Sequence, residues 1–339
     1  MFQFHKYPSI ENAGLTCFID KIKSHGYADE SFCITEKIHG ANTQICYNLK
    51  TNEFSYGKRT CFLEDEEKCY NVQNIFEAIK ENIINLSKRL LSFTKKDIEN
   101  VIVYGEIFGG FYPHEKVEKD NSATKVQKGV YYSPKNEWRA FDIAYTVTED
   151  NQFRFLCGND FFKICKETDI KTVPLLTVAS SLSEALEYPN DKQSVVSQQL
   201  NLPPIEDNIM EGVVIKPWNS DFWIGQSRVI IKNKNTKFSE KSHAKKINIQ
   251  VEVSENVKTA IEEVSQFITE ERVNNIISHL GEITVKDIGK IIGLTAKDVL
   301  EDYKKEFNTL NLLEKEEEKM VKKELQRQVA SLVRRVVLG

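Results

Sequence analysis

Short runs of hydrophobic and β-branched residues recur through the first two thirds of the chain. Clusters of Asn, Gly, Asp and Pro separate these runs, as at residues 48–52 and 217–221, and this alternation is typical of strands joined by turns. We expect strands at Ser31–Thr35, Thr43–Tyr47, Val101–Gly105, Trp138–Ala144, Gly212–Lys216 and Arg228–Lys232. Runs of strands with inserted helices favour antiparallel sheets over a wound βαβ array.

Helical periodicity appears once in this region and then dominates the rest of the chain. Apolar residues recur at three- and four-residue spacing between residues 72 and 90, which predicts one helix there. Beyond residue 247 there is no proline, and two apolar stripes predict a helical core. The stripes are Val257, Ile261, Val264, Phe267 and Ile268, then Leu313, Met320, Leu325, Val329, Leu332 and Val336.

A basic stretch separates the two parts of the chain. It carries Lys232, Lys234, Lys237, Lys241, Lys245 and Lys246. We therefore predict one domain over residues 1–240 and a helical domain over residues 247–339.

Composition narrows the class of protein. The chain has 339 residues, of which 40% are hydrophobic and 28% charged, and a net charge of −4, which fits about two globular domains. The acidic balance taken alone argues against a nucleic-acid partner, and charges interrupt every apolar run before it is long enough to span a membrane. Seven cysteines without a C-x-x-C pair favour reduced thiols and a cytoplasmic location.

The sharpest local motif is residues 36–42, which read Glu-Lys-Ile-His-Gly-Ala-Asn. Lys37 follows a predicted strand, and Gly40 would let the backbone approach a ligand closely, so the motif suits an amine nucleophile. A surface lysine beside a turn is the alternative interpretation, and K-x-H-G alone is a modest signal.

Four further blocks follow in order: residues 104–109, 140–143, 211–217 and 231–234. Glu106 and Glu211 lie in otherwise apolar strands, where an unpaired charge is costly to bury. Lys232 and Lys234 are two residues apart and share one strand face, where they would neutralise phosphates beside Lys37. The alternative for Glu106 and Glu211 is a surface position at a sheet edge, and the alternative for Lys232 and Lys234 is an exposed basic strand face.

Taken in this order, the five blocks resemble the motifs of the covalent nucleotidyltransferase superfamily of DNA ligases, RNA ligases and mRNA capping enzymes. Histidine in K-x-H-G, where DNA ligases and capping enzymes carry aspartate, resembles the RNA ligase 2 branch. That branch holds the double-strand RNA ligase of T-even bacteriophages and the trypanosome RNA-editing ligases. Residues 4–12 are similar to the start of the phage enzyme, and residues 126–142 are similar to the editing ligases.

The resemblance implies an α+β fold. It consists of an N-terminal, ATP-grasp-like nucleotidyltransferase domain of antiparallel sheets with flanking helices, and a small all-α C-terminal domain that engages RNA. The implied cofactors are ATP, with AMP held covalently on Lys37, and Mg²⁺ or Mn²⁺ held by Glu211. The implied catalytic residues are Lys37, His39, Arg59, Glu211, Lys232 and Lys234. The implied nucleotide-binding residues are Glu36, Lys37, Ile38, Asn42, Arg59, Glu106, Phe141, Glu211, Lys216, Lys232 and Lys234.

Several of these roles have a structural alternative. Phe141 would stack on adenine, or would be a core phenylalanine because Ile143 shares its strand face. His39 would act after lysine adenylation, or would bridge the loop. Lys216 would contact the α-phosphate, or would lie in solvent at a strand end. Arg272, Asp298 and Asp302 lie roughly where the family engages RNA, but a surface position is the favoured interpretation.

The resemblance thus implies a monomeric ATP-dependent RNA ligase that seals 3′-hydroxyl and 5′-phosphate ends, preferentially at nicks in duplex RNA, without membrane association. The abundance of Asn, Lys and Ile suits an AT-rich, viral or phage genome. A DNA ligase or capping enzyme is one alternative, although those enzymes usually continue into a β-rich OB-fold. A catalytically dead RNA-binding homologue is the other.

Overall fold

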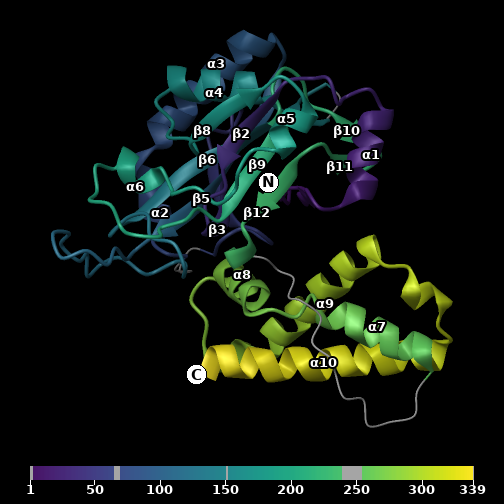
Figure 1. Ribbon diagram of the computed structural model, residues 1–339. Helices are drawn as coiled ribbons and strands as arrows, with labels where there is room; N and C mark the ends of the chain where they lie inside the picture. Colours follow the sequence, from purple (N-terminus) through teal and green to yellow (C-terminus); the bar gives the residue numbers. More distant parts are fainter. Residues whose placement is uncertain (1–2, 65–68, 150–151, 239–253, 339) are drawn as a thin grey trace. The chain divides into compact units, whose positions relative to one another are not determined.

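The computed structural model describes residues 3–64, 69–149, 152–238 and 254–338 (Figure 1). The chain divides into two compact units, Met1–Asn235 and Thr236–Gly339. Lys241, Lys245 and Lys246 of the basic stretch, and the predicted boundary between residues 240 and 247, lie outside the described residues. Within the described residues, no helix combines the length and apolarity needed to cross a membrane.

The first sheet of the N-terminal unit carries the K-x-H-G segment. Its strands, in spatial order, are β1 (Glu11–Asn12), β12 (Ile231–Lys234), β9 (Gly212–Pro217), β2 (Phe32–Glu36) and β8 (Leu175–Ala179). All neighbours are antiparallel except β1 and β12, which are parallel. The predicted strand Arg228–Lys232 is divided, since Ser227–Arg228 forms β11 of a hairpin with β10 (Trp223–Ile224).

The second sheet is antiparallel throughout. Its order is β4 (Phe54–Lys58), β3 (Ala41–Asn48), β5 (Ile98–Gly109), β6 (Asn136–Val147) and β7 (Phe153–Phe155). Strands β5 and β6 each extend several residues beyond their predicted ends. The predicted α+β class with antiparallel sheets is confirmed.

Helices cover the outer face of each sheet. Helices α2 (Val72–Ala78), α3 (Lys80–Thr94) and α4 (Gly158–Glu167) pack on the second sheet, and α1 (Thr16–Ser24) and α5 (Leu182–Leu186) on the first (Figure 1). A short helix, α6, spans Val196–Gln199. The single helix predicted over residues 72–90 is wrong in one respect, because Ile79 (φ −108°, ψ 8°) interrupts it. The apolar stripe continues across this break, since Phe76 and Ile83 both reach the same core, so periodicity alone does not reveal it.

The inner faces of the two sheets meet in a smaller aromatic-rich core. Ile102, Tyr104 and Ala144 of the second sheet pack there with Tyr7 and with Ile230, which precedes β12.

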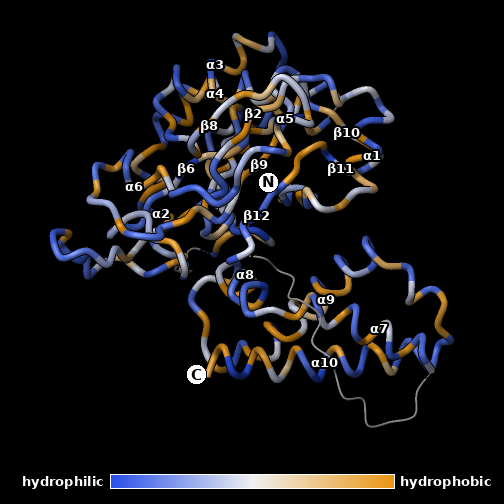
Figure 2. Tube along the Cα trace, viewed as in Figure 1, coloured by the Kyte–Doolittle hydropathy of each residue, from blue (hydrophilic) through white to orange (hydrophobic). Residues whose placement is uncertain are grey.

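The C-terminal unit is helical. It comprises α7 (Glu255–Ser265), α8 (Glu270–Leu280), α9 (Ile288–Glu306) and α10 (Lys315–Leu338), with 3₁₀ turns at Thr236–Phe238, Val285–Asp287 and Thr309–Leu312. The Ser254 and Thr269 hydroxyls cap α7 and α8 by accepting backbone N–H bonds. Hydrophobic and hydrophilic residues alternate along α10 (Figure 2). The buried stripe of α10 includes Val321. The prediction that Met320 belongs to this stripe is wrong, because Met320 is 42% exposed.

Candidate nucleotidyltransfer site

Lys37 lies at the end of β2, directly opposite the start of β9. Its backbone N–H donates to the carbonyl of Gly212 at 2.9 Å, which continues the β2–β9 ladder by one residue. Its Nζ lies 2.7 Å from Oε2 of Glu211, and the Lys37 side chain remains 20% exposed. The ladder therefore delivers a reachable amine and a buried carboxylate to the same point.

Glu211 is the centre of a compact charged cluster. Oε1 of this carboxylate lies 3.0 Å from Nζ of Lys234, and Oε2 lies 3.4 Å from Nδ1 of His39. Burial acts to raise the pKa of Glu211, but the charges of Lys37 and Lys234 outweigh it and hold that pKa well below its usual range. Glu211 is therefore an ionised anchor that orients the Lys37 amine.

Gly212 permits the close approach of β9 and β12 at this cluster. It adopts φ +149°, and a Cβ there would lie 2.2 Å from the carbonyl oxygen of Asn233. The absence of a side chain thus brings Lys234 to Glu211. Lys232 lies two residues before Lys234 on the same face and is paired in register with Val214, and its side chain is half-buried.

A second carboxylate, that of the half-buried Glu106, comes from the other sheet. Its strand partner is Asn42, which is buried, and the Gly40 backbone N–H donates to the Glu106 carboxylate. Burial raises the pKa of Glu106 to about 7, against the opposing charges of Lys37 and the half-buried Arg59. Lys37, Arg59, Glu106 and Glu211 thus share one electrostatic environment.

The neighbouring strand β5 is enough to require a glycine at position 40. A Cβ at Gly40 would lie 2.2 Å from the carbonyl oxygen of Ile107 and 3.0 Å from Cγ of Glu106. The K-x-H-G segment therefore approaches β5 closely at Gly40, and the approach to a ligand stays a prediction.

Glu36 and Ile38 are placed apart from the Lys37 amine. The Glu36 carboxylate accepts bonds from the Ser194 hydroxyl at 2.6 Å and the Val195 N–H at 2.9 Å. It is 1% exposed, and burial raises its pKa to about 7. Ile38 is buried at 3% exposure. Glu36 is thus not brought together with the Lys37–Glu211 pair.

Phe141 points into the inter-sheet layer because of a β-bulge. Tyr104 pairs with Asp142 and Gly105 with Ala140, which leaves Phe141 as the extra residue. Its ring lies 5.0 Å from that of Tyr7 in an edge-to-face arrangement, and the ring is half-buried. Ile143 belongs to the outer core instead, so the expectation that the two residues share a face is wrong.

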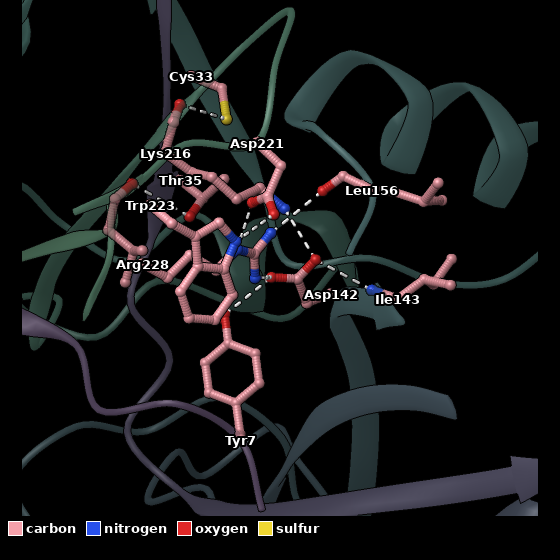
Figure 3. Close-up of polar contacts among 11 residues, drawn as sticks. Tyr7, Cys33, Thr35, Asp142, Ile143, Leu156, Lys216, Asp221, Trp223 and Arg228 are labelled. Carbon is pink, nitrogen blue, oxygen red and sulfur yellow. Dashed lines mark hydrogen bonds and ion pairs between the residues drawn. The ribbon is translucent and has the colours of Figure 1, made fainter. Parts of the chain in front are cut away.

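Lys216 is held by a buried network that sequence reasoning missed (Figure 3). Its Nζ lies 3.2 Å from Oδ1 of Asp142, whose Oδ2 accepts from Nη1 of Arg228 at 2.6 Å and from the Tyr7 hydroxyl at 2.8 Å. Arg228 also bonds Asp221 and lies 3.8 Å from the centre of the Phe155 ring. The alternative of a solvent-exposed Lys216 is therefore wrong, since this lysine is only 6% exposed.

Tyr132 also belongs to the site and was not predicted. Its hydroxyl accepts the backbone N–H of His39 at 2.9 Å, and the residue is fully buried. The signal available in the sequence was a tyrosine within residues 126–142, the segment similar to the editing ligases. Its hydrogen-bond partner, His39, is 93 residues away in the sequence and could not be predicted.

The three polar residues singled out in the helical unit form an ion-pair cluster in which Arg272 is buried and the two aspartates are partly exposed, so the surface position favoured for them is wrong for Arg272. Arg272 is 1% exposed; its Nη2 lies 3.1 Å from Oδ2 of Asp302, and Nη1 also bonds Asp298. Its Nε donates to the carbonyl of Phe267 at 2.9 Å. The arginine thus ties α8 to α9.

Among the described side chains there is no cluster of three or more His, Cys, Asp or Glu residues able to hold a metal ion. Mg²⁺, however, is usually bound by one or two carboxylates together with substrate phosphates and water. The half-buried Glu106 and the buried Glu211 are close enough to influence each other's ionisation, so they fit a metal that arrives with a polyphosphate.

Two family models match the chain. The family model described as RNA ligase matches residues 30–234, which is more than half of the chain. The model described as T4 RNA ligase 2 C-terminal matches residues 251–331.

Individual relatives are distant but extend over most of the chain. The mitochondrial RNA-editing ligase 2 of Trypanosoma brucei brucei is 23% identical over 352 residues, covering 89% of this chain and 83% of the relative. The mitochondrial RNA-editing ligase 1 of the same organism is 22% identical, covering 87% and 74%.

A solved mutant of the Naegleria gruberi RNA ligase with ATP and Mn is 18% identical with a TM-score of 0.43; the match covers 69% of this chain and 57% of that one.

From the two family-model matches, the chain belongs to the RNA ligase family, in its RNA ligase 2 branch.

Proposed function

We propose that this RNA ligase is ATP-dependent and joins 3′-hydroxyl and 5′-phosphate RNA ends, preferentially at nicks in duplex RNA, through AMP bound covalently to Lys37. The observation that carries the proposal is the reachable Lys37 amine, 2.7 Å from the buried and ionised Glu211. An amine nucleophile fixed by a carboxylate and surrounded by cations suits attack on a phosphate.

In the first step Lys37 Nζ forms a bond to the α-phosphorus of ATP. The α–β phosphoanhydride bond breaks, pyrophosphate leaves, and the amine loses a proton to solvent. Glu211 accepts the hydrogen bond that aims Nζ, while Lys234 and Arg59 offset the negative charge of the phosphates. Phe141, turned inward by its bulge, supplies an aromatic face for the base.

A divalent cation fits the same place. Glu211 and Glu106 would hold the cation. Its positive charge would lower the pKa of Glu106, which burial raises to about 7, so Glu106 would become ionised. When bound, the cation supplies polarisation of a phosphoryl oxygen.

The two later steps use the same cations. An oxygen of the RNA 5′-phosphate attacks the AMP phosphorus and breaks its bond to Nζ of Lys37. The 3′-hydroxyl then attacks the 5′-phosphorus, loses its proton and displaces AMP. His39, held by the Tyr132 hydroxyl through its backbone and by Glu211 through its ring, lies beside the lysine throughout these exchanges.

The test is to incubate the full chain, first stripped of bound AMP with pyrophosphate, with α-labelled ATP and Mg²⁺. We expect label on the denatured protein, and none on Lys37→Ala or Lys37→Arg. The arginine variant keeps the ion pair with Glu211, so loss of label there reports chemistry and not folding. Lys23→Ala, an exposed lysine on α1, is the matched control and should keep the label.

Label from GTP but not ATP would replace the proposal with capping chemistry, and label persisting in Lys37→Arg would refute the assigned nucleophile. Duplex preference is tested with nicked RNA, nicked DNA, hybrid nicks and single-stranded RNA. Faster sealing of DNA nicks or of single strands than of nicked duplex RNA would refute that part.

A further inference from the structure

The connection between β5 and β6 carries a lysine held over two aromatic rings. Nζ of Lys125 lies 4.8 Å from the centre of the Phe111 ring and 5.8 Å from that of the Tyr131 ring. Both rings are half-buried, and their centres are 5.9 Å apart in an edge-to-face arrangement. We call Phe111, Lys125, Lys128 and Tyr131 the aromatic–lysine platform.

Hydrogen bonds to the body of the unit fix this platform. The Tyr131 N–H donates to Oδ1 of Asn208 at 2.8 Å, and Nδ2 of Asn208 donates back to the Tyr131 carbonyl at 2.7 Å. The Thr124 N–H donates to Oδ1 of Asn136 at 3.0 Å, next to Lys125. The rings and the lysine are therefore pre-positioned, which lowers the entropic cost of binding a ligand there.

The platform carries positive charge without an acidic partner. Neither Lys125 nor Lys128 forms an ion pair with a carboxylate in the described parts of the chain, and both side chains are exposed. Partial desolvation of the Lys125 ammonium by its neighbours, followed by the charge of Lys128, lowers the pKa of Lys125. A bound anion would relieve both effects, because it stabilises the charged form of each lysine.

The platform is close to the candidate site along the chain. Phe111 follows Glu106 by five residues, so their backbones are separated by at most about 18 Å. Tyr131 directly precedes Tyr132, whose hydroxyl holds the His39 backbone. A distance of about 18 Å corresponds to roughly five base-pair steps along a duplex.

We propose that Lys125 and Lys128, supported by the rings of Phe111 and Tyr131, bind backbone phosphates of the RNA within a few base pairs of the nick. This inference rests on the proposed function. Lysines contact phosphates in any sequence, and aromatic rings beside them contact the sugars or bases, so the platform would strengthen binding without reading sequence.

The test is equilibrium binding of a fluorescently labelled nicked RNA duplex to the full chain, without ATP, followed by anisotropy. At 0.1 M salt each lost phosphate contact weakens binding roughly five- to tenfold, so Lys125→Ala/Lys128→Ala should raise the Kd roughly 30-fold or more. The slope of log Kd against log salt concentration should decrease by about two, which is about one for each lost phosphate contact. Lys125→Arg keeps the charge and the ring contacts, and should bind within about threefold of wild type.

Lys116→Ala/Lys119→Ala is the matched control, since it removes two exposed lysines from the same connection beside Glu115, Glu118 and Asp120. An equal loss in this control, or an unchanged Kd and salt slope in the Lys125/Lys128 variant, would overturn the inference. Failure of the proposed function is seen separately, as absence of label on Lys37 whatever the binding result.

Discussion

Glu36, the buried carboxylate held by Ser194 and Val195, offers a direct test of how burial controls ionisation in this unit. Its buried carboxylate has a pKa of about 7 in place of its ordinary 4.5, chiefly because burial penalises the charged form. The folded protein therefore binds this proton more tightly than the unfolded chain does. The contribution of Glu36 to the free energy of unfolding must therefore fall as the pH rises from about 4.5 to about 7. Above about 7 the folded protein bears the full free-energy cost of burying the charged carboxylate.

Glu36→Gln imitates the protonated acid, because the amide is neutral and its oxygen still accepts from Ser194 or Val195. A pKa raised from 4.5 to about 7 corresponds to about 3 kcal/mol, at about 1.4 kcal/mol for each pKa unit. We expect the variant to match wild type near pH 4.5 and to be more stable by up to about 3 kcal/mol at pH values above about 8.

The assay is denaturant unfolding of the full chain followed by tryptophan fluorescence. The chain's three tryptophans, Trp138, Trp218 and Trp223, all lie in the unit Met1–Asn235, so this signal reports the unit that contains Glu36. Exposed Glu187, changed to Gln, is the matched control and should differ from wild type by less than about 0.5 kcal/mol at every pH.

A stability difference between Glu36→Gln and wild type that stays constant with pH would refute the reasoning. So would a variant that is less stable than wild type at high pH. Either result would mean that the bonds from Ser194 and Val195 outweigh the burial of the charge.

Two other substitutions test the packing of each unit. Gly40→Ala would place a methyl group 2.2 Å from the Ile107 carbonyl oxygen, so we expect the free energy of unfolding to fall by about 1–3 kcal/mol in the same fluorescence assay. Gly14→Ala, where the added Cβ has no atom within 4 Å, is the control and should be nearly neutral. Equal effects of the two substitutions would contradict this prediction. Arg272→Ala removes a buried guanidinium that joins α8 to α9, and should lower the stability of the helical unit by about 3 kcal/mol, measured by far-UV circular dichroism. An unchanged unfolding midpoint would show that the cluster contributes nothing to stability.

The strands and the charged residues that gather at the candidate site were predictable because each is marked by local sequence. Alternation of apolar residues located the central strands, and the five motif blocks singled out Lys37, Glu106 and Glu211, which the fold places in one electrostatic environment. What escaped prediction depends on a single residue of register. The bulge at Phe141 reverses which face that ring occupies, and the break at Ile79 leaves the apolar stripe intact.

Long-range polar partners also escaped prediction. Asp142 is joined to Tyr7 across 135 residues and to Arg228 across 86, and no spacing rule links such positions. Arg272 resembled a surface residue because its partners lie on another helix. Sequence indicates which residues carry charge, whereas only the fold determines which charges are already neutralised.

That distinction resolves the conflict between an acidic chain and a polyanionic substrate. Binding a phosphate requires cations that are held in place and can exchange their partners, and the net charge of −4 measures neither property. At the candidate site Lys37 and Lys234 share the single carboxylate of Glu211, so two positive charges are offset by one negative charge. A polyphosphate can therefore supply the missing negative charge without displacing the pair, and a metal ion that arrives with it keeps Glu211 and Glu106 compensated. The surplus of cations is local to the strand ends, which is why a protein with an acidic total can still be built to handle phosphates.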